Sequence, residues 1–323
     1  MTYLETVKDV YREAAEAPAQ NLCCVGQPPL RLPDLNIPPI MYEMDYGCGA
    51  AVQVGDLQPN QTSLYVGVGG GLEALYLAYY SRKPQGVIAV DPVPEMREAA
   101  RKNFEEAAEL NDWFDPSFVD IRDGDALNLP IENNTIDLAA QNCLFNIFKQ
   151  GGDLEKALTE MFRVLKLGGR LVMSDPICEA TIPEHLQDDE RLRAACLSGC
   201  IPIHQYINAI TDAGFGMVEI RSRKPYRILQ KEEHNLDDHL LLESIEVAAV
   251  KSPMPEDGPC IFTGRTACYL GSDETFDDHK GHLLTKGIPL AVCDKTAAAL
   301  AKLNRDDIII TNSTWHYNGG GCC

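Results

Sequence analysis

The segment 63-SLYVGVGGG-71 indicates the fold class of this chain of 323 residues. A short apolar run, Ser63 to Val66, leads directly into a turn that contains four glycines. Glycine lacks a Cβ, so its backbone can turn sharply and approach a ligand closely. The next stretch, 72-LEALYLAYYSR-82, is typical of a helix. The segment therefore predicts a strand, a tight glycine turn and a helix.

Strands and helices continue to alternate beyond this turn. Strands are expected at 86-GVIAVD-91, 118-FVDIRDGDALNLP-130, 136-IDLAAQNCLFNI-147 and 168-GGRLVMSD-175, and helices at 93-VPEMREAARKNFEEAAEL-110 and 153-DLEKALTEMFRVLKLGG-169. This alternation predicts a doubly wound, Rossmann-like α/β domain with a parallel sheet. Later helices are expected at residues 182–200, 203–215 and 231–247, and a strand at residues 258–271.

We divide the chain into four parts on this basis. Residues 1–60 hold an N-terminal helix and a proline-rich wrapping segment, and residues 61–180 form the Rossmann-like cofactor domain. Residues 181–251 are expected to be helical, and residues 252–323 to form a smaller α+β domain with a flexible tail, 318-NGGGCC-323.

The charge of the chain narrows the classes of partner. It contains 48 acidic and 28 basic residues, for a net charge of −20. Binding to nucleic acid or to an anionic membrane needs basic patches, so neither is expected. The apolar runs are too short to span a membrane, and the N-terminus has no signal-peptide core, which favours a soluble, cytoplasmic protein.

Twelve cysteines are many for a chain of this size in a reducing compartment. They favour metal, redox or catalytic roles over a disulfide framework. The sequence contains no CxxC pair and no Cys/His spacing of the zinc-finger type. The pair Cys196 and Cys200 would place both sulfurs on one face of a helix, if this stretch is helical.

The glycine turn and one spaced acid point to a cofactor. Asp91 follows Gly71 by twenty residues and ends the next expected strand. An acid at this place accepts hydrogen bonds from ribose hydroxyls, so the pattern favours an adenosine-containing cofactor over a turn without a ligand. The loop reads G-x-G-G-G from Gly67 rather than G-x-G-x-x-G, which serves the pyrophosphate of NAD.

Two further stretches resemble class I S-adenosylmethionine methyltransferases. The stretch 122-RDGDALNLP-130 resembles their adenine-contacting segment, and 165-LKLGGRLVMSD-175 resembles their glycine turn and following strand. In that family an acid usually stands two residues before the first glycine, where this chain has Tyr65, so the methionine ammonium needs Glu73 or a backbone carbonyl instead. The resemblance implies cofactor contacts from Gly67, Gly69, Gly71, Asp91, Asp125, Ala126 and Asn142.

Four cysteine-containing stretches carry a more specific resemblance. They are "DYGCGA" around Cys48, "QNCLFNI" around Cys143, "AACLSGC" around Cys196 and "GPCIFTG" around Cys260. In this order, together with the core, they resemble the arsenite S-adenosylmethionine methyltransferases. The resemblance implies that Cys48, Cys196 and Cys260 bind As(III) as thiolates, and that residues 181–251 form the arsenic-binding region.

The same resemblance implies the reaction. Methyl groups pass from S-adenosylmethionine to thiolate-bound As(III), giving mono- and dimethylated arsenicals, with thioredoxin or glutathione as the reductant and with Cys23 and Cys24 as redox cysteines. As(III) is soft and prefers thiolates. Its lone pair attacks the methyl group, so positioning at about 3–3.5 Å matters more than a general base.

Two other functions and two local alternatives remain open at this stage. A methyltransferase of a small organic thiol or carbon acid would explain the core but not the cysteines, and a non-catalytic metalloid-binding protein would fit Tyr65. Cys268 is the alternative to Cys260 as the third ligand. Cys322 and Cys323 are expected to capture As(III) by thiol exchange, unless the tail has no such role.

Overall fold

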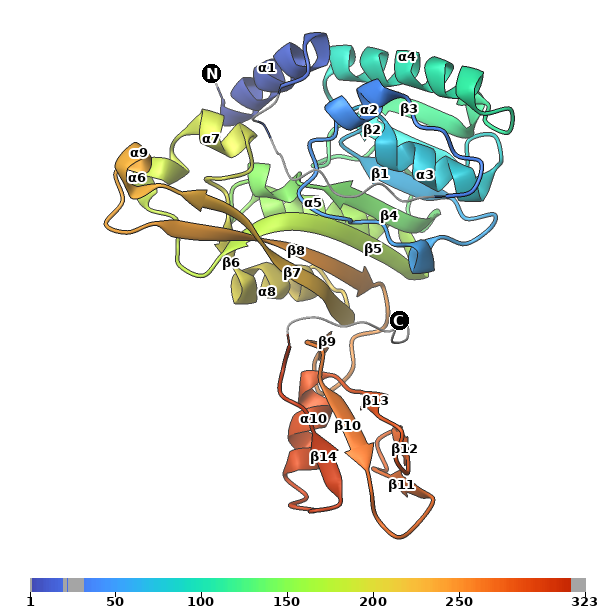
Figure 1. Ribbon diagram of the computed structural model, residues 1–323, viewed down its shortest axis with the longest axis vertical. Coiled ribbons are helices and arrows are strands. Elements are labelled where there is room, and N and C mark those ends of the chain that lie inside the picture. The colour runs from blue at the N-terminus through green and yellow to red at the C-terminus, as the bar shows by residue number, and fades with distance from the viewer. Residues whose placement is uncertain (1, 20–21, 23–31, 315–323) are drawn as a thin grey trace.

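The computed structural model describes residues 2–19, 22 and 32–314, and a mixed sheet runs through its centre (Figure 1). The strand order is β3-β2-β1-β4-β5-β8-β7-β9, and β6 pairs with β5. The strands of this sheet are β1 (Ser63–Val66), β2 (Val87–Asp91), β3 (Val119–Asp123), β4 (Ile136–Asn142), β5 (Leu165–Cys178), β6 (Ile201–Pro202), β7 (Met217–Leu229), β8 (Leu240–Val250) and β9 (Cys260–Phe262). All neighbouring strands are parallel except β8, which is antiparallel to β5 and β7.

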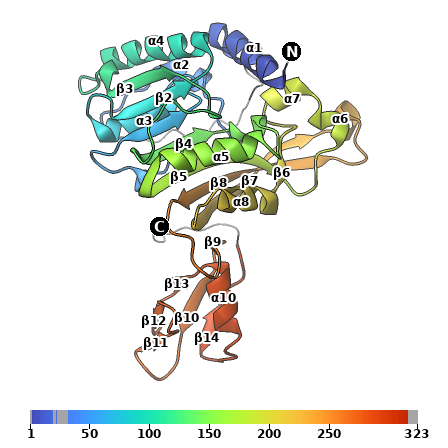
Figure 2. The ribbon, with the colours of Figure 1, turned by 180° about the vertical axis from the view of Figure 1, so that it is seen from behind.

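Helices cover both faces of this sheet. The described α-helices are α1 (Tyr3–Glu16), α2 (Pro39–Glu43), α3 (Leu72–Ser81), α4 (Pro94–Leu110), α5 (Asp153–Val164), α6 (Glu184–Gln187), α7 (Glu190–Ala194), α8 (Ile203–Asp212), α9 (Lys231–His234) and α10 (Asp294–Ala301). The buried side chains of α3 and α4 pack in one apolar cluster, and those of α5 and α8 pack in another. Figure 1 shows α3 in front of the sheet, whereas Figure 2, from behind, shows α5 in front. The predicted doubly wound α/β fold is confirmed.

The glycine turn forms as expected. β1 and β2 are buried along their whole length, which agrees with their apolar sequences. Gly71 precedes α3 with a φ of 90°, and an added Cβ would lie 2.7 Å from the ring of Phe104. This position therefore requires glycine for both backbone conformation and packing.

Two expected helices are wrong. Residues 231–247 form only the short α9, and the run from Leu240 onward is the strand β8. β8 lies between β5 and β7 and is largely buried on both faces, so its apolar residues do not alternate, and a buried strand of this kind resembles a buried helix in sequence. The second half of the region expected to be helical, residues 217–250, thus consists mainly of the two long strands β7 and β8.

The expected helix at residues 182–200 is also interrupted. Asp189 begins a new helix, because its Oδ1 accepts hydrogen bonds from the backbone N–H groups of Arg191 and Leu192, both at 2.9 Å. α7 ends at Ala194, and Cys196 has a φ of 58°. Cys196 and Cys200 therefore lie in a turn rather than on one helical face.

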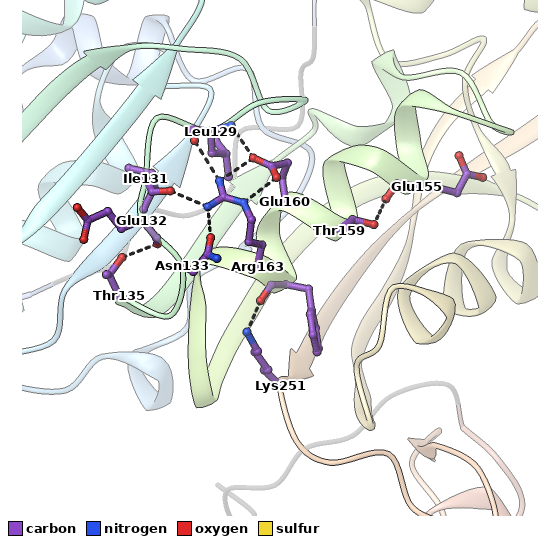
Figure 3. Close-up of polar contacts among 11 residues, drawn as sticks. Leu129, Ile131, Glu132, Asn133, Thr135, Glu155, Thr159, Glu160, Arg163 and Lys251 are labelled. Carbon is purple, nitrogen blue, oxygen red and sulfur yellow. Dashed lines mark hydrogen bonds and ion pairs between the residues drawn. The ribbon is translucent and has the colours of Figure 1, made fainter.

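Arg163 of α5 holds the segment that follows β3 (Figure 3). Its Nη1 donates to the carbonyl oxygen of Ile131 at 2.7 Å, and its Nη2 donates to that of Leu129 at 3.1 Å. Glu160 completes the contact, because it pairs with Arg163 and accepts from the backbone N–H of Leu129 at 2.8 Å. These contacts fix the end of the loop that begins with Asp125.

The chain after β8 forms a smaller α+β module, as predicted, which extends from the β9 edge of the sheet (Figure 1). In it, α10 packs against a three-stranded sheet and a two-stranded hairpin. Its remaining strands are β10 (Thr266–Tyr269), β11 (Thr275–Asp277), β12 (Leu283–Thr285), β13 (Leu290–Ala291) and β14 (Ile308–Ile310). Within the described part of the chain, no helix is both long and apolar enough to cross a membrane.

Candidate active site

A cavity lies where β1, β2 and β4 end, which is where open α/β sheets bind their ligands. Its walls include most of the predicted cofactor residues, namely Gly67, Gly69, Asp91, Asp125, Ala126 and Asn142. Gly71 lies behind this wall, at the start of α3. The cavity therefore brings together predicted cofactor residues that span 75 positions of the sequence, from Gly67 to Asn142.

Asp91 is oriented by the backbone around it. Its Oδ2 accepts from the N–H of Val68 at 3.0 Å, and its Oδ1 accepts from the N–H of Val93 at 2.9 Å. Burial raises the pKa of Asp91 to about 6, against which these two hydrogen bonds act. A carboxylate oxygen accepts more than one hydrogen bond, so Asp91 retains acceptor capacity for ribose hydroxyls.

Glu73 provides a buried acidic side chain close to Tyr65, the position at which this sequence lacks the acid that is usual before the glycine turn. The carboxylate lines the cavity, accepts a hydrogen bond from Nδ2 of Asn142 at 2.8 Å and is bonded by the Tyr65 hydroxyl. Burial, followed by the nearby Asp45 carboxylate, raises the pKa of Glu73 to about 7. A buried carboxylate beside a second acid favours a cationic ligand, as the methionine ammonium would be.

The N-terminal helix covers the cavity, a role that the sequence analysis missed. Leu4, Val7, Lys8 and Tyr11 of α1 belong to its lining. Figures 1 and 2 show α1 along the top of the molecule beside α4 and α7. The hydroxyl of Tyr11 donates to the carbonyl oxygen of Ala194 at 3.3 Å, two residues before Cys196. The amphipathic pattern of α1 predicted a helix, but no signal told which surface it would cover.

Asn142 connects the cavity to Cys48. Its Oδ1 accepts from the backbone N–H of Cys48 at 3.0 Å, while its Nδ2 donates to the carbonyl oxygen of Gly49 at 2.8 Å, as well as to Glu73. The Sγ of Cys48 is buried and lies 3.4 Å from the Oγ of Ser174 on β5. One side chain thus positions both the proposed ammonium partner and a predicted arsenic ligand.

Cys196 contacts the backbone of Cys143, a residue that lines the cavity. The Cys196 thiol donates to the carbonyl oxygen of Cys143 at 2.7 Å, and Cys143 N–H donates to the carbonyl oxygen of Ser174 at 2.7 Å. Both cysteines are buried and have left-handed backbones, with φ of 59° at Cys143 and 58° at Cys196. Such conformations cost energy in residues other than glycine and are concentrated at functional sites. Cys143 also lines the cavity.

Cys260 lies elsewhere. It pairs with Met217 at the edge of the sheet, in register with Val250 and then Arg170 of β5. Three strand spacings across the sheet and four residues along β5 separate it from Ser174, which is roughly 20 Å at ordinary strand dimensions. Among the described residues, no three His, Cys, Asp or Glu side chains are arranged to hold a metal ion.

The other predicted thiols are not part of this site as described. Cys268 lies on β10 in the C-terminal module. Cys23, Cys24, Cys322 and Cys323 fall outside the described residues. None of the eight described cysteines forms a disulfide.

Comparison with known proteins agrees with this architecture. Residues 64–173 match the family model of the methyltransferase domain. The arsenite methyltransferase of Halobacterium salinarum is 29% identical over 179 residues, which are 55% of this chain and 43% of that protein. The arsenite methyltransferase of Aquipseudomonas alcaligenes is 25% identical over 262 residues, which are 78% of this chain and 72% of that protein. The match to the first of these relatives thus spans less than half of its length.

The fold has a solved counterpart. The crystal structure of an arsenic (III) S-adenosylmethionine methyltransferase from Chlamydomonas reinhardtii superposes with a TM-score of 0.63, at 22% identity, over 90% of this chain and 99% of that one. At this identity the likeness establishes the fold alone. Residues 64–173 therefore match a methyltransferase domain, in a chain that has the fold of an S-adenosylmethionine methyltransferase and whose sequence resembles the arsenite methyltransferases.

Proposed function

We propose that this protein transfers methyl groups from S-adenosylmethionine to thiolate-bound As(III), giving mono- and dimethylated arsenicals as a cytoplasmic detoxification step. The observation that carries the proposal is the position of Asn142. This residue links Glu73 in the cofactor cavity to the backbone of Cys48, and Cys143 and Cys196 lie on the same side. Buried thiols beside a methyl donor suit a soft, thiophilic substrate, because soft ions prefer sulfur ligands.

The residues around the cavity fit the proposed cofactor. S-adenosylmethionine supplies an electrophilic methyl group when it is bound. Asp91 is placed to accept from ribose hydroxyls, Glu73 to balance an ammonium group, and Asp125 and Ala126 to form the wall on the adenine side. Four residues of α1 line this cavity and limit the access of water to the reacting groups.

The thiols act as ligands rather than as bases. Cys48 and Cys196 lose their protons as they bind As(III), and the arsenic lone pair then serves as the nucleophile, so no general base is required. For the third ligand the geometry favours Cys143, whose backbone carbonyl accepts a hydrogen bond from the Cys196 thiol. The predicted Cys260 is roughly 20 Å from Ser174, by strand dimensions, and Ser174 contacts the Cys48 thiol. A thiol reductant, thioredoxin or glutathione, returns the methylated arsenic to the trivalent state, with Cys23 and Cys24 as its redox partners.

Arsenite-dependent turnover tests the proposal. The full chain is incubated with S-adenosylmethionine that carries a labelled methyl group, a thiol reductant and arsenite, and the labelled arsenicals are separated. Cys196→Ser should abolish their formation, because a hydroxyl is a poor ligand for a soft ion and has a much higher pKa than a thiol. Cys200→Ser is the matched control, because the Cys200 thiol is also buried in this turn but donates its hydrogen bond to the carbonyl oxygen of Cys196. We expect this variant to retain activity.

The two variants also discriminate between functions. Cofactor binding, measured by calorimetry, should be nearly equal in Cys196→Ser and in the parent protein. Normal arsenical formation by Cys196→Ser would remove this residue from the site. Methyl transfer to an organic thiol without any dependence on arsenite would instead favour a small-molecule methyltransferase, and cofactor binding without turnover would favour a metalloid-binding protein.

A further inference from the structure

A second pair of thiols meets in the C-terminal module, away from the proposed methyl-transfer site. Cys260 begins β9, and Cys293 is the residue before the first turn of α10. Hydrogen bonds on both sides hold these two segments together. The Lys295 ammonium donates to the carbonyl oxygen of Gly258 at 2.7 Å, and the Thr263 hydroxyl donates to Oδ1 of Asp294 at 2.6 Å.

The side chains between these anchors are in contact. The Cys260 thiol lies beside Cys293 and the ammonium of Lys295, and both groups act on its pKa. Cys293 is 2% exposed and lies 3.2 Å from the Oγ1 of Thr296, whereas Cys260 is only partly buried and gives access from solvent. Burial, ahead of the neighbouring Cys293 sulfur, raises the pKa of Cys260, which keeps this residue a thiol in the unliganded protein.

We propose that Cys260 and Cys293 form a separate two-thiol site that binds monosubstituted trivalent arsenicals. Two thiols match such a ligand because R–As(OH)₂ has two exchangeable hydroxyls. Each Cys S–H bond is replaced by a Cys S–As bond, each As–OH bond breaks, and two molecules of water leave, with no change of oxidation state. The product is a closed ring in which both sulfurs bind one arsenic.

The fold favours closure of this ring. The second As–S bond forms within one rigid unit, because β9 is paired with β7 while α10 is fastened to the residues on both sides of Cys260. No third thiol, imidazole or carboxylate completes a metal site here among the described residues. That composition suits an arsenic with one organic substituent better than a divalent metal, which needs three or four ligands. Lys295, paired with Asp257, adds a positive charge that favours departure of the thiol protons.

The ligand class rests on the proposed function, because a protein that methylates arsenite produces monomethyl arsenicals. The site itself does not. At ordinary strand dimensions an arsenical on Cys260 is roughly 20 Å from Ser174, which contacts the Cys48 thiol. Binding at Cys260 can therefore be measured independently of methyl transfer.

Protection from alkylation tests the site in the full chain. The parent for this test is the Cys196→Ser variant, in which the competing thiols are weakened; it is fully reduced and treated with an excess of phenylarsine oxide over all of its thiols. A limiting amount of N-ethylmaleimide then labels exposed thiols, and the Cys260 peptide is quantified by mass spectrometry. We expect phenylarsine oxide to slow labelling of Cys260 at least tenfold, and 2,3-dimercaptopropanol to restore it. Cys268, also partly exposed in the same module, should label at an unchanged rate.

Cys293→Ser, added to this background, separates a two-thiol site from a single reactive cysteine. Protection of Cys260 should fall to less than twofold, because one thiol cannot close the ring, while circular dichroism reports the fold. Equal protection with and without Cys293, or an unchanged Cys260 rate in the parent, would overturn the proposal. The outcome of this test does not bear on arsenite methylation. Cys293→Ser alone should methylate arsenite at the rate of the unmodified chain.

Discussion

Glu73→Gln tests the assignment of the methionine ammonium. In the unliganded protein, burial and the adjacent Asp45 carboxylate raise the pKa of Glu73 to about 7, so the group is largely protonated below that pH. A bound ammonium stabilises the ionised form and lowers this pKa. Binding of S-adenosylmethionine then requires loss of a proton from Glu73 at acidic pH, and cofactor affinity should fall as the pH falls through 7.

The size of the effect follows from the two protonation states. With a pKa of about 7 in the free protein and Glu73 fully ionised in the complex, affinity falls about tenfold between pH 8 and pH 6, or about 1.4 kcal/mol. Asp91, with a pKa of about 6, adds a factor of about two over the same interval if its carboxylate must be ionised to accept ribose hydroxyls. The parent protein should therefore lose about twentyfold, and Glu73→Gln only about twofold.

Calorimetry at pH 6, 7 and 8 measures both proteins, and a second ligand provides the control. Methylthioadenosine has the adenosine moiety but no amino-acid group, so its affinity for the parent protein should change only about twofold, through Asp91. An S-adenosylmethionine affinity that is independent of pH in the parent, or an equally steep dependence in Glu73→Gln, would refute the assignment. The ammonium would then bind to a backbone carbonyl.

Four further substitutions examine other parts of the structure. Asp91→Ala should weaken cofactor binding by about 1.5–3 kcal/mol in calorimetry, without changing arsenite affinity measured in the absence of cofactor, because it removes charge-assisted hydrogen bonds. Cys143→Ser should slow arsenite methylation at least tenfold, whereas Cys260→Ser should retain most of the rate; the reverse order would restore Cys260 as the third ligand. Arg221→Met should lower the free energy of unfolding in urea by about 3 kcal/mol, since it leaves the fully buried Asp56 carboxylate with Arg170 as its remaining ion-pair partner.

The parts of the site that the sequence predicted are those in which a short segment determines its own geometry. The strand, glycine turn and helix around Gly67 are adjacent in the chain, and Asp91 ends the next strand, so their positions follow from the topology of any doubly wound sheet. Glu73 could be named for the same reason, because it lies in the first turn of the helix that the glycines open.

Contacts between distant segments could not be predicted in this way. The predicted helix at residues 231–247 is wrong because a strand buried between two others has no polar face to reveal its period. α1 was correctly expected as a helix, but its position over the cavity depends on side chains more than a hundred residues away, such as the Tyr3–Asp153 and Tyr11–Ala194 contacts. Asn142 was named as a cofactor residue from resemblance alone, without its bond to Cys48.

The position of Cys260 illustrates why the order of motifs along a chain is weaker evidence for a shared site than the register of strands in the sheet. To reach arsenic at Cys196, β9 would have to leave β7, break its ladder and the bond from Cys260 N–H to the carbonyl oxygen of Gly216 at 2.8 Å, and pull α10 with it. Each lost backbone hydrogen bond costs about 1 kcal/mol, before the cost of exposing the apolar side of α10. Cys293 meets Cys260 without any such movement. The fold therefore favours two separate groups of thiols over one group that includes Cys260, and an arsenical would pass between them through solution or through a mobile thiol carrier.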